Sequence, residues 1–327
     1  MVALYLTATA PGAGKTAICA GLGKHLLNHG KKVSYFKPVT ARNADSDARF
    51  MKQVLALSEA EDVLSPVISD LTNAGVIKEA YDRVAKGKDV VIVEGMADKS
   101  KDNGIVAALE ARVVMVVGYT TSLPVADVVA GGKELGKHLL GVVVNRVPRH
   151  KVDKLAGELS APLNAAGIKL LGVLPEDRVL SAVTVAELAQ RLGGEILNNA
   201  DKTTKLVENY MMGALGVDSG LIYFGRKLNK AVIARAGRPD IQLAALETPT
   251  RCLIVTDNKA PAGVVMRRAQ EKQVPIIQAK DDVDATVAGI EEALAQSRFN
   301  QERKLPRLSE IMAGRFNFKS LEQGLAG

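Results

Sequence analysis

The sequence contains no tryptophan, and aromatic residues make up only 4% of its 327 residues. Its hydrophobic cores must therefore be aliphatic, and base stacking on aromatic side chains, which many RNA-binding proteins use, has few residues to rely on. A strong charge of one sign is also missing, because the formal net charge of +7 is modest and spread along the chain. Without a clustered basic patch, this balance argues against a nucleic-acid partner.

Cysteine is nearly absent, and apolar runs of membrane-spanning length are absent altogether. Cys19 and Cys252 both stand in apolar segments, without another cysteine or a histidine at the spacing of metal ligands. This argues against a disulfide framework and a cysteine-based zinc site, and it is typical of a reducing cytosol. No signal peptide precedes the first apolar segment. We expect a cytoplasmic protein with no membrane partner and with two small core cysteines.

The first seventeen residues after the initiator methionine read VALYLTATAPGAGKTAI and predict a phosphate-binding loop. Val2 to Thr7 has the composition of a buried strand, Pro11 to Gly14 forbids a continuing helix, and an apolar helix-forming segment begins at Thr16. This strand, loop and helix context is the one that such a loop requires. Thr9 occupies the place of the usual first glycine, so a simple turn before a Lys-Thr pair is the alternative.

The chemistry of this loop assigns a role to each of its residues. Backbone N–H groups around Gly12 and Gly14 can surround a β-phosphate at the helix N-terminus. Lys15 adds a positive charge, and the Thr16 hydroxyl can ligate Mg²⁺. We predict that ATP and Mg²⁺ are the cofactors, with nucleotide contacts from this list: Gly12, Ala13, Gly14, Lys15, Thr16 and Ala17.

Two charged residues follow predicted strands and therefore lie at the carboxyl edge of the sheet, where ligands of parallel α/β sheets collect. Lys37 comes after the strand 32–36 and can meet an anion, although a solvated lysine before Pro38 is an equal alternative. Glu94 comes directly after the apolar strand 89–93. It is either exposed at the edge or placed against a metal, and the nearby phosphate loop favours the metal.

Strands alternate with helices along the first 195 residues, which predicts a doubly wound parallel sheet in a nucleotide-binding domain, 1–195. We take the polar segment 193–204 as a linker and predict a smaller α/β domain over 205–297, followed by a C-terminal tail, 298–327. The further strands are expected at 113–118, 141–144, 170–174, 221–224, 230–234, 253–256 and 275–278. The main helices are expected at 16–30, 48–57, 71–86, 124–135, 151–166, 183–192, 240–246, 261–271 and 283–294.

The landmarks APGAGKT, FKPV, NADSD, VEG and GVVVNR stand in the order in which they occur in the dethiobiotin synthetase branch of P-loop NTPases, which residues 1–195 therefore resemble. The resemblance implies that Thr16, Asp47 and Glu94 hold Mg²⁺. It also implies that Lys37 contacts a substrate or carbamate, which would make Lys15 and Lys37 catalytic, and that Asn145 recognises adenine. The segment after Glu94 lacks the glycines of the synthetases, so nucleotide binding carries over better than ring closure.

Residues 205–297 resemble a DRTGG domain, because AGRPDIQL and the Thr256 segment match its strand-end signatures. The succession of the two domains resembles the N-terminal region of long phosphotransacetylases, in which the pair is regulatory. The printed sequence holds no acetyl-transfer domain after them, so we expect the free-standing version and a homodimer. A possible second site, for a small-molecule effector or for dimer formation, is expected at Arg238, Asp240 and Thr256, with an Asp240 helix cap as the alternative.

Two functions remain open at this point. The first is a nucleotide-responsive regulatory or sensing protein, in which ATP and Mg²⁺ at the first domain alter the second. The alternative is an ATP-dependent ligase that activates a carboxylate or carbamate, as dethiobiotin synthetase does. Whether the protein is an enzyme, as such a ligase or as an ATP hydrolase, stays open. The intact phosphate and metal residues, beside altered substrate segments, favour the first.

Overall fold

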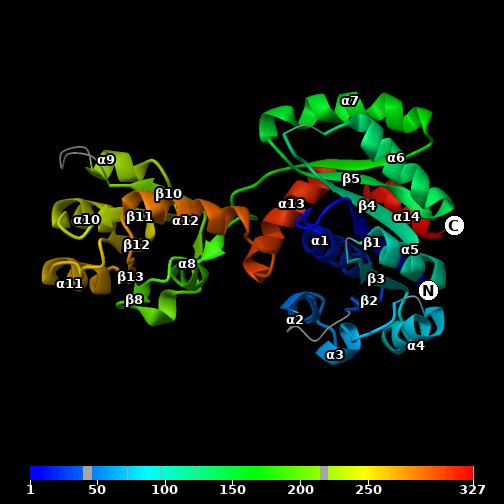
Figure 1. Cartoon of the computed structure of the whole chain (residues 1–327), viewed down its shortest axis with the longest axis horizontal. Coiled ribbons are helices and arrows are strands. Elements are labelled where there is room, and N and C mark those ends of the chain that lie inside the picture. The colour runs from blue at the N-terminus through cyan, green and yellow to red at the C-terminus, as the bar shows by residue number, and fades with distance from the viewer. Residues whose placement is uncertain (40–45, 72, 97, 122, 214–219, 327) are drawn as a thin grey trace. The chain divides into compact units, whose positions relative to one another are not determined.

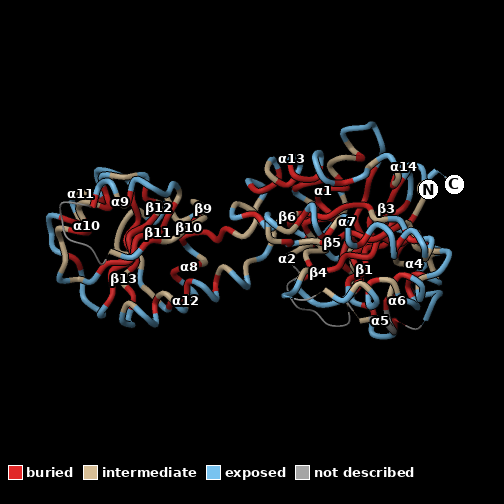
Figure 2. The backbone as a smooth tube through the Cα atoms, turned by 90° about the horizontal axis from the view of Figure 1, so that it is seen from above, coloured by how far each residue is buried: buried red, intermediate tan, exposed pale blue. Residues whose placement is uncertain are grey.

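The computed structural model describes residues 1–39, 46–71, 73–96, 98–121, 123–213 and 220–326, and it divides the chain into two compact units (Figure 1). Unit 1 comprises Met1–Asp177 together with Phe299–Gly327, and unit 2 comprises Arg178–Arg298. Each unit has its own buried core, as the burial along the backbone shows (Figure 2). The predicted boundary near residue 195 therefore lies about twenty residues beyond the division that the structure makes.

Unit 1 is built on a six-stranded sheet in which every neighbouring pair is parallel. The strand order is β2-β3-β1-β4-β5-β6, which confirms the doubly wound parallel sheet. Its strands are β1 (Val2–Ala8), β2 (Val33–Phe36), β3 (Val90–Glu94), β4 (Arg112–Gly118), β5 (Leu139–Val147) and β6 (Leu170–Pro175). They read as continuous apolar runs because helices cover both faces of the sheet, so that side chains of either parity are buried.

Helices of unit 1 pack on the two faces of the sheet. They are α1 (Lys15–Asn28), α2 (Ser46–Val54), α3 (Glu61–Leu64), α4 (Ala74–Ala85), α5 (Lys99–Ala108), α6 (Val125–Leu135), α7 (Val152–Ala165), α13 (Leu305–Arg315) and α14 (Phe318–Ala326). α6 and α7 share one apolar cluster with β4, β5 and β6. On the other face, α13 packs against α1 and β6, and α14 packs against β5 and β6 (Figure 1). Helix α5 follows Glu94 and was not predicted from the sequence.

The prediction of a C-terminal tail over 298–327 is wrong. Helices α13 and α14 bury Leu308, Met312 and Leu321 in unit 1. Where α13 crosses α1, Gly21 makes room, because a Cβ there would lie 2.2 Å from the Met312 sulfur. The physical reason is that a sheet with one bare face cannot stay exposed, so the chain returns to cover it.

Unit 2 has a five-stranded sheet in the order β10-β11-β12-β13-β8, parallel except for the antiparallel β8 at its edge. Its strands are β8 (Glu195–Ile196), β10 (Asn209–Met212), β11 (Lys230–Arg235), β12 (Thr250–Thr256) and β13 (Ile276–Gln278), and the short β7 (Val183–Thr184) and β9 (Leu206–Val207) pair separately. Its helices are α8 (Val185–Arg191), α9 (Gly220–Gly225), α10 (Pro239–Leu246), α11 (Gly263–Glu271) and α12 (Val283–Ala295). α9, α10 and α11 share one apolar cluster with the sheet, and α8 and α12 share the other.

Three further predictions fail in unit 2. The expected strand 221–224 is helix α9, and the strand that pairs with β11 is β10 instead. The expected linker 193–204 contains β8, which pairs with β13, and α8 belongs to this core rather than closing unit 1.

The two cysteines are buried and unpaired, as predicted. Among the helices of the described part of the chain, none is long and apolar enough to cross a membrane.

Candidate phosphate and metal site

The loop between β1 and α1 has the backbone conformation that its glycines allow. Gly12 has a φ of 76° and Gly14 a φ of 96°, both in the left-handed region that favours glycine. Gly14 is also the N-cap of α1, so the unpaired N–H groups of the first helical turn and the positive end of the helix dipole lie at this loop. The Lys15 ammonium makes no hydrogen bond or ion pair within the described residues. The loop is therefore built to hold an anion.

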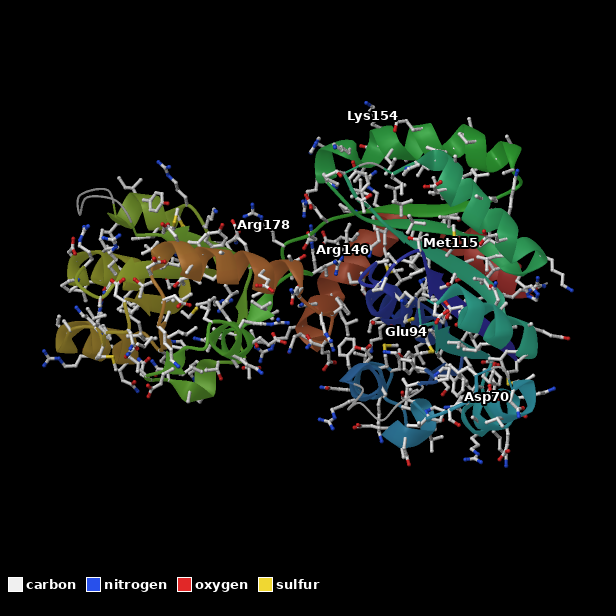
Figure 3. All side chains as sticks on the ribbon, viewed as in Figure 1. Asp70, Glu94, Met115, Arg146, Lys154 and Arg178 are labelled. Atoms are coloured by element: carbon white, nitrogen blue, oxygen red, sulfur yellow. The ribbon has the colours of Figure 1, made fainter. Side chains whose placement is uncertain are left out.

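Glu94 lies beside this loop, because β3 pairs with β1 and ends next to the first turn of α1 (Figure 3). The Thr16 hydroxyl donates to Glu94 Oε1 at 2.7 Å, and the Tyr35 hydroxyl donates to Oε2 at 2.7 Å. The Glu94 side chain is only 3% exposed. Burial raises the pKa of this carboxyl above its usual value, against the lowering effect of Lys37 and of the two hydroxyl donors.

Lys37 and Asp47 form the other half of the cluster. The Lys37 ammonium lies 2.5 Å from Asp47 Oδ2, and both side chains are largely shielded from solvent. Each of the two charges acts on the pKa of Glu94, Lys37 lowering it and Asp47 raising it. The structure thus brings Thr16, Asp47 and Glu94, the three predicted metal ligands, into one group with Lys37.

The donor set fits a hard divalent cation. It offers one hydroxyl and two carboxylates, and Mg²⁺ prefers a few such oxygens together with phosphate and water. Because the Thr16 hydroxyl gives its hydrogen to Glu94, its oxygen lone pairs are free to face a metal. Glu94 thus has two tasks, since it orients Thr16 and supplies negative charge. When bound there, Mg²⁺ would neutralise charge on the terminal phosphates.

Asn145 reaches the loop from near the end of β5, where it still pairs in register with Gly118 of β4. The pairing of β5 with β6 changes register between Val144 and Val147, and Arg146 has a φ of 62°. The irregularity lies at Arg146, so Asn145 follows the ordinary alternation of the strand and shares the face of Val143. Asn145 Nδ2 donates to the Ala13 carbonyl oxygen at 2.9 Å, and it lies 2.3 Å from the position of a Cβ on Gly14. Asn145 therefore holds the loop, and any side chain at position 14 would collide with it.

Asp102 and Tyr35 are residues of this site that the sequence did not reveal. Asp102, on α5, accepts hydrogen bonds from the hydroxyls of Tyr5 and Thr7, at 2.8 and 2.7 Å, and from the backbone N–H of Met96, at 2.9 Å. It thereby ties the segment after Glu94 to strand β1. No motif or strand-end position points to Asp102, because it lies within a helix. Tyr35 lies within the buried strand β2, a position at which the sequence suggests a core side chain rather than a hydroxyl of the site.

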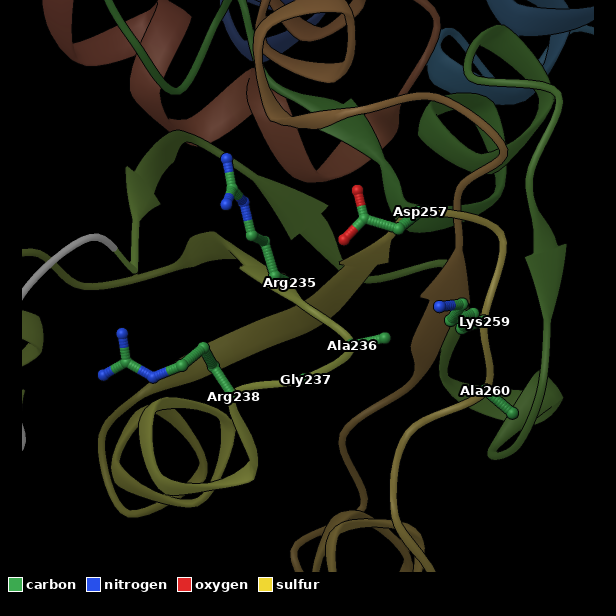
Figure 4. Close-up of a pocket in the computed structure, with 7 residues that line it drawn as sticks. All are labelled: Arg235, Ala236, Gly237, Arg238, Asp257, Lys259 and Ala260. Atoms are coloured by element: carbon green, nitrogen blue, oxygen red, sulfur yellow. The ribbon is translucent and has the colours of Figure 1, made fainter.

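The residues expected at a second site are only partly brought together. Arg238 donates to Asp240, with its Nη2 2.8 Å from Oδ2, so these two side chains bind each other. Asp240 accepts from Arg238 in the first turn of α10, and the side chain of the N-cap residue Arg238 makes no capping hydrogen bond. Thr256 is fully buried and does not line the pocket to which Arg238 contributes (Figure 4). Arg235 and Lys259 line this pocket and were not predicted.

Two family models match the chain in succession. The AAA domain model matches residues 2–184, more than half of the chain, and the DRTGG domain model matches residues 187–293. The chain belongs to the AAA domain family. The predicted order, a P-loop domain followed by a DRTGG domain, is confirmed.

Several phosphate acetyltransferases are relatives of this AAA domain protein. The enzyme of Nitratidesulfovibrio vulgaris is 25% identical over 343 residues, which cover 92% of this chain and 48% of the relative. That of Deinococcus radiodurans is 25% identical over 354 residues, which cover 97% of this chain and 50% of the relative. The chain therefore spans about half the length of the curated relatives it matches. Among solved structures, the cell division protein MinD of Aquifex aeolicus matches 55% of this chain and 84% of its own, at 19% identity and a TM-score of 0.39.

Proposed function

We propose that this protein is a nucleotide-responsive regulatory or sensing protein, in which ATP and Mg²⁺ bound at the P-loop of the AAA domain change the state of the DRTGG domain. The observation that carries the proposal is the hydrogen bond from the Thr16 hydroxyl to Glu94, directly at the N-terminus of α1. A hydroxyl and a carboxylate side by side at a phosphate-binding loop support Mg²⁺ binding there, because Mg²⁺ prefers a few protein oxygens together with phosphate and water.

Each residue of the loop has a role in this proposal. The backbone of Gly12 to Gly14 and the first turn of α1 hold the β-phosphate, and Lys15 neutralises charge on the β- and γ-phosphates. Thr16 ligates Mg²⁺, with Glu94 and Asp47 directly or through water. Lys37 is held by Asp47 until a terminal phosphate, which competes for its ammonium, arrives.

The ligase alternative is not favoured. The relatives that match nearly the whole chain are acetyltransferases, and this chain corresponds to about half of their length. Incubation with ATP, Mg²⁺, bicarbonate and a diamine tests the alternative, because a ligase would release ADP only when the diamine is present.

Calorimetry tests nucleotide binding. Lys15→Ala removes a charge from the phosphates and should weaken ATP binding by about 2 kcal/mol, roughly thirtyfold in Kd. Lys31→Ala is the matched control, since Lys31 is an exposed lysine beyond the end of α1. Equal ATP affinity in the wild type and in Lys15→Ala would refute the assignment of the loop.

Hydrogen exchange tests the response. ATP with Mg²⁺ should change the exchange of backbone amides in unit 2, and the same addition to Lys15→Ala should leave them as they are. Exchange that changes only around the P-loop, with ATP bound, would mean that the protein binds nucleotide without passing the signal on.

A further inference from the structure

Unit 2 contains a pocket of about 550 Å³ at the carboxyl ends of the adjacent strands β11 and β12 (Figure 4). Its lining comes from the ends of these strands and the segments that follow them: Arg235 at the end of β11, Ala236, Gly237 and Arg238 after it, and Asp257, Lys259 and Ala260 after β12. The volume lies in the range of small-molecule sites. A bare ion would leave most of this space empty, so the pocket suits an organic molecule.

Two cations in this pocket are available to a ligand. Arg235 and Lys259 are exposed, and their side chains have no hydrogen bond or ion pair with any part of the chain that the structure describes. The Asp257 carboxylate is also exposed and has no hydrogen bond or ion pair with the described part of the chain. Arg238 differs from them, because it is bound to Asp240 at the edge of the pocket. The lining of the pocket therefore includes two cationic donors and one acceptor that a ligand can bind.

The backbone that carries these side chains is braced. Gln242, which is fully buried on α10, donates from Nε2 to the carbonyl oxygen of Arg235 at 2.6 Å. The N–H of Arg238 donates to the same oxygen at 3.1 Å, which closes the turn. On the other side, the N–H of Asp257 donates to the Asp281 carbonyl oxygen at 3.1 Å. A braced pair of turns loses little conformational freedom when a ligand binds, and this favours affinity.

We propose that this pocket binds a small phosphomonoester with hydroxyl groups, such as a sugar phosphate or a nucleoside monophosphate. The doubly charged phosphate matches the two cations, and the guanidinium of Arg235 offers a planar fork to its oxygens. Asp257 accepts a hydrogen bond from a hydroxyl of the organic part, which a bare phosphate lacks. Gly237 leaves room for that part, because a Cβ on it would meet no atom within 4 Å. This site is separate from the P-loop and does not depend on it.

The test uses the full chain carrying Lys15→Ala, so that phosphate binding at the P-loop is suppressed, and ribose 5-phosphate as the probe. Hydrogen exchange should slow in the segments 235–239 and 256–262, and calorimetry should record binding that weakens with added salt. In this background, Arg235→Ala and Lys259→Ala should each weaken binding about tenfold or more. Arg226→Ala, at an exposed arginine of unit 2 that does not line the pocket, is the matched control and should bind normally.

Two further variants separate charge from shape. Gly237→Leu keeps every charge but takes up part of the pocket, and it should weaken binding of ribose 5-phosphate. Position 237 has no left-handed φ, so leucine fits its backbone. Asp257→Asn should weaken binding of ribose 5-phosphate but not of inorganic phosphate. Equal affinity for inorganic phosphate and ribose 5-phosphate would overturn the proposal, as would normal binding in Arg235→Ala and Lys259→Ala. Absence of slowed exchange in both segments at millimolar ribose 5-phosphate would also overturn it.

Discussion

At the scale of single residues, Glu94 and Asp47 differ in what surrounds them although both are expected to serve one metal. Glu94 is buried and accepts from two hydroxyls, whereas Asp47 faces an ammonium. Glu94→Gln replaces one acceptor oxygen by a donor that the hydroxyl of Thr16 or of Tyr35 must meet. The proposed Mg²⁺ binding at this cluster therefore requires a carboxylate at this position.

Glu94→Gln and Asp47→Asn should each weaken the Mg²⁺-dependent part of ATP binding by about 1 to 3 kcal/mol, the cost of losing a charged partner. The measurement is calorimetry of ATP with Mg²⁺ and with EDTA. Glu79→Gln is the control, since Glu79 is an exposed carboxylate of unit 1 paired with Arg83. Unchanged Mg²⁺ dependence in either site variant would remove that residue from the metal site.

The side-chain amide of Asn145 can form more hydrogen bonds than the one that it makes to the loop. One N–H of Nδ2 is bound to the Ala13 carbonyl, and its second N–H and its oxygen have no partner in the described part of the chain. These two groups match N7 and the N6-amino group of adenine, whereas guanine offers an acceptor at the second position.

If Asn145 recognises adenine, ATP should outcompete GTP by about tenfold or more, because an unpaired buried group costs about 1 to 3 kcal/mol. Asn145→Ala should bring the two affinities together, even though it also loosens the loop for both nucleotides. Competition calorimetry measures the ratio. A wild-type protein that binds both nucleotides equally would leave Asn145 with the loop-holding role alone.

Lys230 is a buried cation without a carboxylate partner in the described residues. Its side chain is fully buried at the start of β11, and its ammonium donates to Thr248 Oγ1 and to the Pro249 carbonyl oxygen, at 3.0 and 3.1 Å. Burial lowers its pKa from 10.5 to about 8. Between these values the unfolded chain keeps a proton that the folded chain has lost, so this residue makes unit 2 more stable as the pH rises through that window.

Urea unfolding followed by circular dichroism at pH 7 to 10 tests this effect in the wild type and Lys230→Met. The unfolding free energy of the wild type relative to the variant should rise by up to about 3 kcal/mol over that range. The comparison cancels other groups that titrate there. A constant difference would show that Lys230 has an ordinary pKa.

At the scale of elements, the crossing of α1 and α13 decides whether the C-terminal segment is structural. The Met312 side chain fills the space beside Gly21 that a larger residue at position 21 would need. Helix α13 reaches this position only because the chain returns to unit 1 after unit 2. Its packing should therefore add to the stability of unit 1.

Met312→Ala should lower the unfolding free energy of unit 1 by about 2 to 5 kcal/mol, through the cavity it leaves. Gly21→Ala should cost about 1 to 3 kcal/mol, because its methyl group overlaps the Met312 sulfur. The double variant should cost less than the sum of the two, since the added methyl group partly fills the cavity. Urea unfolding measures all three. Additive costs near zero would mean that α13 is loosely attached.

Other elements show why local patterns were misleading. Residues 221–224 read LIYF and have the composition of a strand, yet they form the short helix α9. Strand β10 reads NYMM, and its residues are buried to different degrees, so the segment has no regular apolar pattern that would predict a strand. Pairing with β11 makes 209–212 a strand, whereas Leu221 and Ile222 are exposed on helix α9. Composition alone misled in both cases, since strand preferences describe a half-buried surface rather than an intrinsic property of the backbone.

At the scale of the whole molecule, the order of the two matched domains was predictable, but their extents were not. The motif of each domain is local, whereas the closing helices of unit 1 lie beyond unit 2 in the chain. The expected homodimer stays a prediction, which light scattering at several protein concentrations would check. A mass of one chain at every concentration would contradict it.

The sequence by itself determined the six apolar strands of the first sheet and the loop that follows its first strand. Long apolar runs and glycines at left-handed positions act locally, so they are visible without a structure. Only the tertiary structure decided which side chains meet at that loop. Glu94 reaches Thr16 because β3 lies beside β1, and Asn145 reaches the loop because β4 and β5 follow β1 in the sheet and end at the same edge. Contacts between residues so far apart in the chain depend on strand order and register, which no local pattern encodes.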